Sequence, residues 1–191
     1  MEYQIEFFTN DLIDKLVSES RCDLNSLSLA IPISYAIEHA NLNWNDIFFA
    51  FYNRYISNEA VIEFAKYVVD DYINDDIVLD LVCLSPNEVN RESLLNDFLL
   101  RLIDKNKMNE AKSKLLYIVL SFIFDRKSCF EDPARAVEVV YADFNYPEEM
   151  KDFVRFMPAS KDAMSLKLDE TERIFNNWKR YLDSCKTKYG S

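Results

Sequence analysis

The sequence has a single glycine, Gly190, and a single histidine, His39, among its 191 residues. Glycine normally makes up about 7% of a chain, and it supplies the positive-φ positions that tight hairpin turns, bulges and phosphate-binding loops require. Without it, a hairpin-rich sheet, a Rossmann loop or a P-loop cannot be built. One histidine excludes multi-histidine metal sites. These shortages predict an all-α protein that is not an enzyme.

Basic residues are fewer than acidic ones. The chain has 22 Lys and Arg and 33 Asp and Glu, which gives a net charge of −11. A nucleic-acid-binding protein needs a basic face to neutralise phosphates, so this balance argues against that class. The excess of negative charge suits either plain solubility or a partner with a positive surface. Composition alone leaves both interpretations open.

No pair of cysteines has the Cys-x-x-Cys spacing of a metal or redox site. The chain has only four cysteines, far apart: Cys22, Cys83, Cys129 and Cys185. We expect buried thiols rather than a disulfide framework.

Long apolar runs are missing as well. The first residues, MEYQIEFFTNDL, are acidic and have no basic region before an apolar core, so we expect no signal peptide. The longest apolar run, residues 115–124, is interrupted by Ser121 and is too short to cross a bilayer. We therefore expect a cytoplasmic protein that has no membrane partner.

Helix start signals are frequent in the remaining sequence. Asn43 followed by Asp46 predicts a capping box, and Ser85-Pro86 with Glu88 predicts a helix continuing to Asp104. Further helix starts are predicted at Thr9 or Asn10, Ser57, Asp132-Pro133 and Tyr146-Pro147, and at Asp169, whose helix would end at Gly190 in a left-handed conformation.

Together these signals predict one all-α domain over residues 1–191, built from eight to ten helices in a compact bundle or irregular array. A helix is predicted from about Asn109 to Phe124, and its stretch at residues 115–124 is apolar nearly all round, so this helix belongs at the centre of the core. Residues 157–166 are the place where a minor seam is expected, and no repeat of fixed period is visible.

Few residues suggest chemistry. His39 lies near a predicted helix end, where an ordinary histidine is favoured by the helix dipole, and general-base catalysis would need partners that the sequence does not show. Adjacent acidic pairs such as Asp70-Asp71 point about 100° apart on a helix and do not converge on one metal ion. We therefore predict no catalytic residue, no cofactor and no metal ligand.

One segment has a much larger excess of acidic residues than the rest of the chain. Between Lys66 and Arg91 there is no basic residue, while there are six acidic residues, the last of them Glu88, and Tyr67, Tyr72 and Ile73 are interleaved with the first of these acids. Tyrosines anchor interfaces and charges steer encounter, so this segment is a candidate docking surface for a basic partner; the alternative is a solvated loop and helix end. The candidate partner-binding residues are Tyr67, Asp70, Asp71, Tyr72, Asp75, Asp76 and Asp80.

A second feature is the string YADFNYPEEMKDFVRFMP at residues 141–158. A residue before proline avoids the right-handed helical region, so the string predicts helix, tight turn, helix. We interpret it as a structural clasp rather than a binding site, with the aromatic residues packing the turn and the arginine paired to Asp143 or Glu149. Its members are Tyr141, Asp143, Phe144, Tyr146, Pro147 and Arg155.

This string, together with Asp132-Pro133, the lead-in at 138–141 and WNDI at 44–47, resembles a bacterial family known as domain of unknown function 2247. Members of that family resemble small immunity proteins of polymorphic toxin and contact-dependent growth inhibition systems. The resemblance implies a protein that binds and neutralises the toxin domain of a matching secreted effector.

The leading functional hypothesis is therefore an immunity protein that covers the active site or substrate groove of a toxin, for which a nuclease is one candidate. The alternative is an acidic helical adaptor or a DNA mimic that regulates a nucleic-acid enzyme. Mimicry needs acids in regular rows, whereas these acids are interspersed with 22 basic residues. A metal-dependent helical hydrolase is the weakest hypothesis, and the oligomeric state is left open.

Overall fold

A computed structural model describes residues 7–72, 75–155 and 170–190 of the chain. In these ranges it contains nine α-helices of seven residues or more, and the only β-feature is an isolated parallel bridge between Phe8 and Phe130. The predicted all-α fold class is thus confirmed.

The chain divides into two compact units. Unit 1 comprises residues 1–28 and 117–190, and unit 2 comprises residues 29–116, so the division falls within one helix, α8 (Met108–Asp125). The predicted seam at residues 157–166 lies outside the described residues. The single-domain organisation stays a prediction.

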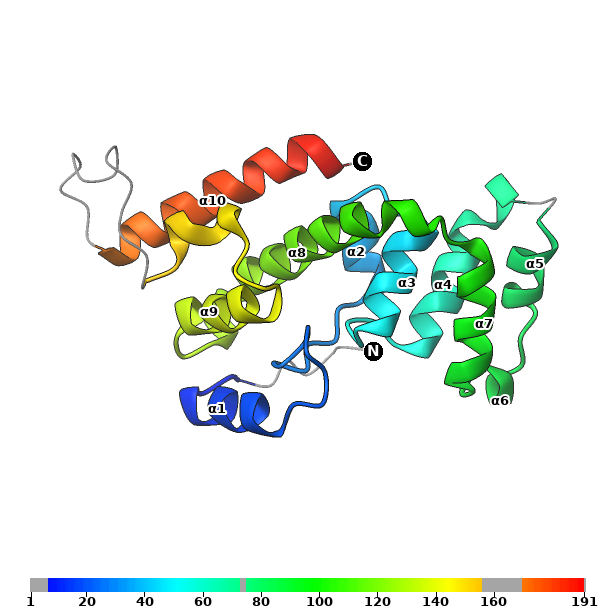
Figure 1. Ribbon diagram of the computed structural model, residues 1–191, viewed down its shortest axis with the longest axis horizontal. Coiled ribbons are helices and arrows are strands. Elements are labelled where there is room, and N and C mark those ends of the chain that lie inside the picture. The colour runs from blue at the N-terminus through cyan, green and yellow to red at the C-terminus, as the bar shows by residue number, and fades with distance from the viewer. Residues whose placement is uncertain (1–6, 73–74, 156–169, 191) are drawn as a thin grey trace. The chain divides into compact units, whose positions relative to one another are not determined.

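Unit 2 is a set of short helices whose starts are fixed by local caps. The capping box of Asn43 and Asp46 and the caps at Ser57 and Ser85 are formed as predicted. Figure 1 shows α3, α4 and α7 running side by side. The elements of unit 2 before α8 are α2 (Ile33–His39), α3 (Trp44–Tyr52), α4 (Asn58–Val68), η1 (Val69–Tyr72), α5 (Asp76–Val82), α6 (Pro86–Val89), α7 (Glu92–Leu102) and η2 (Lys105–Lys107).

The predicted continuous helix from Ser85 to Asp104 is wrong, because it is broken between α6 and α7, where Arg91 has non-helical backbone angles. Val89 and Leu95 are both buried. Six residues correspond to about 600° of helical rotation, which would place these two side chains about 120° apart on a straight helix. The break lets both enter the core of unit 2.

The string at 44–47 is a buried polar clasp in unit 2. Asn45 donates to the carbonyl oxygen of Asp104 (2.6 Å). The Asp46 carboxylate accepts hydrogen bonds from the Asn43 amide (2.8 Å) and from Lys114 Nζ (2.6 Å), and Lys114 also donates to the carbonyl of Asn41 (2.8 Å). Burial raises the pKa of the Asp46 carboxyl group, and the hydrogen bond from Lys114 opposes that rise.

Unit 1 is organised around an aromatic core. Trp178 is fully buried and packs edge-on to Phe124 (ring centroids 5.0 Å apart) and stacked over Phe153 (6.4 Å). In Figure 1, α10 runs along η4. The remaining elements of unit 1 are α1 (Asn10–Glu19), η3 (Lys127–Cys129), α9 (Pro133–Asp143), η4 (Glu148–Phe153) and α10 (Glu170–Tyr189).

The central apolar segment behaves as predicted. Nine consecutive residues of α8, from Leu115 to Ile123, are buried, including Ser121. A helix covered on several sides needs apolar residues all round, which explains why this segment shows no amphipathic pattern.

Arg155 forms a second polar clasp, in unit 1, but with partners other than those predicted. Its guanidinium binds the Glu138 carboxylate through two nitrogens and Asp132 through the third (2.7 Å). The predicted pairing with Asp143 or Glu149 is wrong, because Asp143 instead accepts hydrogen bonds from the backbone amide (2.9 Å) and hydroxyl (2.6 Å) of Ser26.

The turn between α9 and η4 matches the predicted helix–turn–helix pattern, with a 3₁₀-helix as its second helix and Pro147 at its N-cap. Tyr141 and Phe144 are buried, as expected for residues that pack the turn. The same prediction is wrong for Tyr146, which is 61% exposed and only rests edge-on against Tyr141. Its backbone is left-handed, with a φ of 56°.

Gly190 follows α10 as predicted, but the left-handed conformation expected for it is wrong, because its φ is not positive. Its amide donates to the carbonyl of Lys186 (2.9 Å), and a Cβ atom at this position would lie 2.4 Å from that oxygen. Close backbone approach therefore explains the glycine.

The four cysteines are thiols in the structure, and their burial differs from the prediction. Cys185 is buried, whereas Cys83 is exposed and Cys22 and Cys129 are half-buried. Cys83 is exposed because it is the C-cap residue of α5, beyond the buried face that carries Val78 and Leu81.

Positive-φ positions are filled by residues other than glycine, namely Ser28, Arg54, Asn145 and Tyr146. For a residue with a Cβ atom, a left-handed conformation costs about 1–2 kcal/mol. Glycine removes that cost, but it also raises the conformational entropy of the unfolded chain, which lowers the free energy of unfolding by about 0.5–1 kcal/mol. Substituting the exposed Ser28 with glycine should therefore raise the free energy of unfolding by about 0.5–1 kcal/mol.

Urea unfolding measures this effect. The matched control is Ser34→Gly, at an exposed position within α2, which should destabilise by about 0.5–1 kcal/mol. The same sign of change at both positions would contradict the argument.

Candidate functional site

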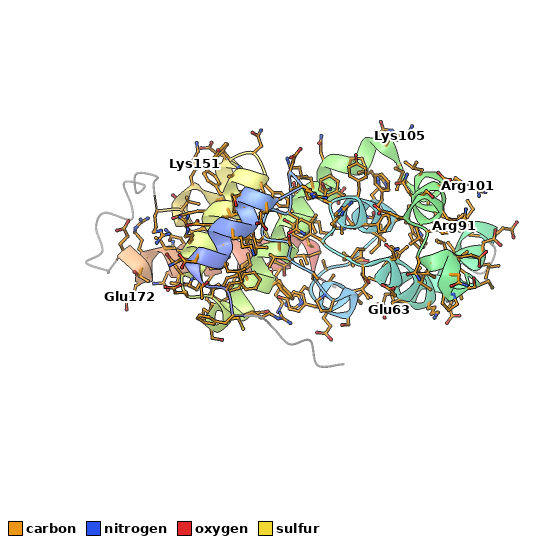
Figure 2. The ribbon with its side chains drawn as sticks, turned by 90° about the horizontal axis from the view of Figure 1, so that it is seen from below. Glu63, Arg91, Arg101, Lys105, Lys151 and Glu172 are labelled. Atoms are coloured by element: carbon orange, nitrogen blue, oxygen red, sulfur yellow. The ribbon has the colours of Figure 1, made fainter. Side chains whose placement is uncertain are left out.

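The predicted acidic segment is exposed in part, and its exposed residues continue a row of exposed side chains on α4. The exposed side chains of α4 and η1 are spaced four, three, one and three residues apart, which places them on one side of the helix axis. They are Glu59, Glu63, Lys66, Tyr67 and Asp70. Figure 2 shows Glu63 on the outer side of α4. We call this set, together with the exposed acids of α5, the acidic face.

The acids of α5 divide into two roles. Asp76 and Asp80 are exposed and lie one turn apart, so they share one side of α5, which packs against α4. Asp75 is instead the N-cap of α5, because its carboxylate accepts from the amides of Ile77 (3.0 Å) and Val78 (3.4 Å). The side chains of Asp71 and Tyr72 lie outside the described part of the structure.

Tyr67 is the exposed aromatic residue of this face, with 64% of its surface accessible. Its ring lies 6.4 Å from that of Phe64, which in turn packs edge-on to Trp44 (5.0 Å) inside the core of unit 2. An aromatic side chain that is exposed at its tip and supported from below is typical of an interface anchor.

The structure adds a groove that the sequence did not reveal. It lies between α4 and the α5–α6 connection and encloses about 310 Å³. Asn58 Nδ2 donates to the carbonyl of Val89 (2.9 Å), which fixes the start of α4 against the end of α6. The residues that line it are Glu59, Ile62, Glu63, Lys66, Leu84, Pro86, Val89 and Asn90. The α6 side of the groove ends at the break before α7, which the apolar periodicity did not indicate.

The charge on this face is strongly one-sided. Across the described parts of α4, η1 and α5, the exposed charged groups are five carboxylates and one lysine, Lys66. Such a surface raises the local concentration of positively charged partners and speeds their association.

The His39 side chain makes structural contacts at the end of α2. It is the last residue of α2, its Nδ1 lies 2.8 Å from the carbonyl oxygen of Tyr35, and its ring stacks on the Tyr35 ring with centroids 3.9 Å apart. A histidine at a helix C-terminus interacts favourably with the helix dipole. The contacts of His39 therefore stabilise the end of α2, and they do not indicate a general base.

Within the described residues, no group of three or more His, Cys, Asp or Glu side chains is arranged to hold a metal ion. Among the helices in those same ranges, none has both the length and the apolar character that crossing a membrane requires.

Fold and surface together define an all-α protein with an acidic, grooved helical face. Residues 33–186 match the model of a bacterial family described as an uncharacterized protein conserved in bacteria, domain of unknown function 2247, and the chain belongs to this family. The matched region contains both polar clasps and the acidic face, and it excludes α1. Neither the curated proteins nor the solved structures gave a match.

Proposed function

We propose that this protein is an immunity protein that binds a cognate bacterial toxin domain and blocks its active site or substrate groove. The observation that supports the proposal most directly is the acidic face with its exposed Tyr67. Toxins that act on nucleic acid need basic substrate surfaces, and such a surface is complementary to this face.

The division of roles on the protein supports the same proposal. The strings that resemble the family signature, at 44–47 and 141–158, supply buried or half-buried clasps within each unit. Clasps of this kind maintain a fold and leave recognition to exposed residues. The acidic face makes few internal contacts and is available for a partner.

Stable complexes bury about 800 Å² on each partner. A surface of that size needs the exposed sides of both α4 and α5 rather than the groove alone. In this arrangement the carboxylates steer the encounter and Tyr67 anchors the bound state.

Reversing the charge of Asp70, Asp76 and Asp80 to lysine should slow association with the toxin domain by about 10- to 100-fold at low salt. All three are exposed and none is an N-cap residue, but Asp76 lies in the first turn of α5, where a lysine opposes the helix dipole, so circular dichroism has to show unchanged helicity before the rates are compared. The measurement is stopped-flow or surface-plasmon association with the toxin domain of the effector encoded beside this gene, combined with an assay of toxin activity.

The matched control reverses three exposed acids of unit 1, Asp23, Glu149 and Asp183, which changes the net charge equally. If both triple variants slow association to the same extent, only net charge matters and the acidic face is not the docking surface. If the unmodified protein forms no complex and leaves the toxin active, the immunity proposal fails and the adaptor hypothesis is the next to test.

A further inference from the structure

The groove between α4 and α6 combines two kinds of surface. Its floor is apolar, because Ile62 and Val89 are both largely buried beneath it. Its α4 wall carries Glu59 and Glu63, which are four residues apart and therefore about 5–6 Å apart at their Cβ atoms. Neither carboxylate forms a hydrogen bond or ion pair with another residue in the described ranges.

The size of the groove limits its occupant. Sites for small molecules and cofactors enclose about 300–1,000 Å³, so a volume of about 310 Å³ is at the lower limit. The groove is also open to solvent, and its α4 wall consists of Glu59, Ile62, Glu63 and Lys66. These dimensions suit one long side chain that projects from a protein surface.

The chemistry of the walls selects the side chain. An apolar floor beside carboxylates fits a side chain with an aliphatic stem and a cationic head, which is arginine or lysine. A planar guanidinium has five donors and can engage two carboxylates at once, whereas an ammonium group is a compact point charge. Lys66 offsets one of the two carboxylates and leaves the groove with a net negative charge.

We propose that this groove binds an arginine side chain of the partner. The stem lies over Ile62 and Val89, and the guanidinium lies between Glu59 and Glu63. This inference rests on the proposed function, because it assigns the arginine to the basic surface of the toxin domain.

A titration of the full-length protein with N-acetylarginine methylamide tests the groove without any toxin. Methyl NMR signals of Ile62, Leu84 and Val89 should shift and saturate with millimolar affinity, and the neutral citrulline analogue should give no saturable shift. The Glu59→Gln/Glu63→Gln variant should bind the arginine probe about tenfold more weakly, since exposed ion pairs contribute about 0.2–1 kcal/mol each. Glu92→Gln/Asp97→Asn, which neutralises two exposed acids of α7, is the matched control and should bind normally.

The same variants are then measured in the complex with the toxin domain, where Glu59→Gln/Glu63→Gln should raise the dissociation rate about tenfold. Equal binding of arginine and citrulline, or an unchanged Glu59→Gln/Glu63→Gln variant, would overturn the arginine assignment. If the complex forms normally while the arginine probe does not bind, the groove inference is wrong and the proposed function stands. If the probe binds while no toxin complex forms, the groove is an arginine site and the proposed function is wrong.

Discussion

Replacing Lys114 with methionine is expected to lower the free energy of unfolding by about 3–5 kcal/mol, because it leaves the buried Asp46 carboxylate without its cation. The two side chains are only 6% and 5% exposed. Solvent therefore cannot take over the role of the lost ammonium group. Chemical denaturation of the purified variant measures the change.

A double variant separates the charge from the packing. In Lys114→Met/Asp46→Asn both charges are gone, and an apolar or neutral replacement of a buried pair is often tolerated. We expect the double variant to be more stable than Lys114→Met alone. A loss below about 1 kcal/mol in the single variant would contradict the importance of the pair.

The effect of Lys114→Met should also depend on pH. Burial already raises the folded-state pKa of Asp46 above its ordinary value, and Lys114 opposes that rise. Without Lys114 the folded protein binds the Asp46 proton more tightly than the unfolded chain does, so its stability increases as the pH falls. The difference between variant and unmodified protein should therefore narrow from pH 7 to pH 5, and a constant difference would refute this explanation.

Replacing Trp178 with alanine is expected to cost about 3–5 kcal/mol, as for other large buried aromatic residues. The residue is fully buried and its ring contacts those of Phe124, Phe153 and Phe175, so the truncation leaves a cavity among several rings. Thermal or urea unfolding of the variant gives the value.

Phenylalanine at the same position serves as the control. The Trp178 Nε1–H group is buried and has no hydrogen-bond acceptor among the described residues. Removing an unsatisfied donor recovers part of the cost of the lost volume. Trp178→Phe should therefore cost less than about 1.5 kcal/mol, and an equal loss in the two variants would rule out the cavity as the cause.

The features that were predictable from the sequence are those that depend on a few consecutive residues. Thr9, Asn43, Ser57 and Asp132 each accept from backbone amides two or three positions later, so the cap and its helix start are visible in the same short string. The central helix was equally clear, because burial on all sides requires an almost wholly apolar sequence, which residues 115–124 have apart from Ser121.

The features that were not predictable depend on distant residues. Arg155 pairs with Glu138 and Asp132, 17 and 23 positions away, and the nearer acids that the sequence suggested face elsewhere. The break between α6 and α7 also has its cause in the core, where Val89 and Leu95 must both be buried.

The candidate site divides in the same way. The acidic character of residues 67–80 is a property of composition and was visible at once, whereas the role of Asp75 as a cap required its backbone geometry. The groove was invisible because Glu59 and Val89, which line it, are 30 residues apart in the chain. The charge of the face was therefore predictable from the sequence, and the groove was not.

The chain has two tryptophans, and each unit contains one of them, Trp44 in unit 2 and Trp178 in unit 1. In a variant that retains only one indole, intrinsic fluorescence reports the melting of one unit alone. A ligand that occupies the groove stabilises unit 2 by mass action, and the Trp44 transition then shifts with ligand concentration. Whether the Trp178 transition shifts with it gives the thermodynamic coupling between the units, without any added label.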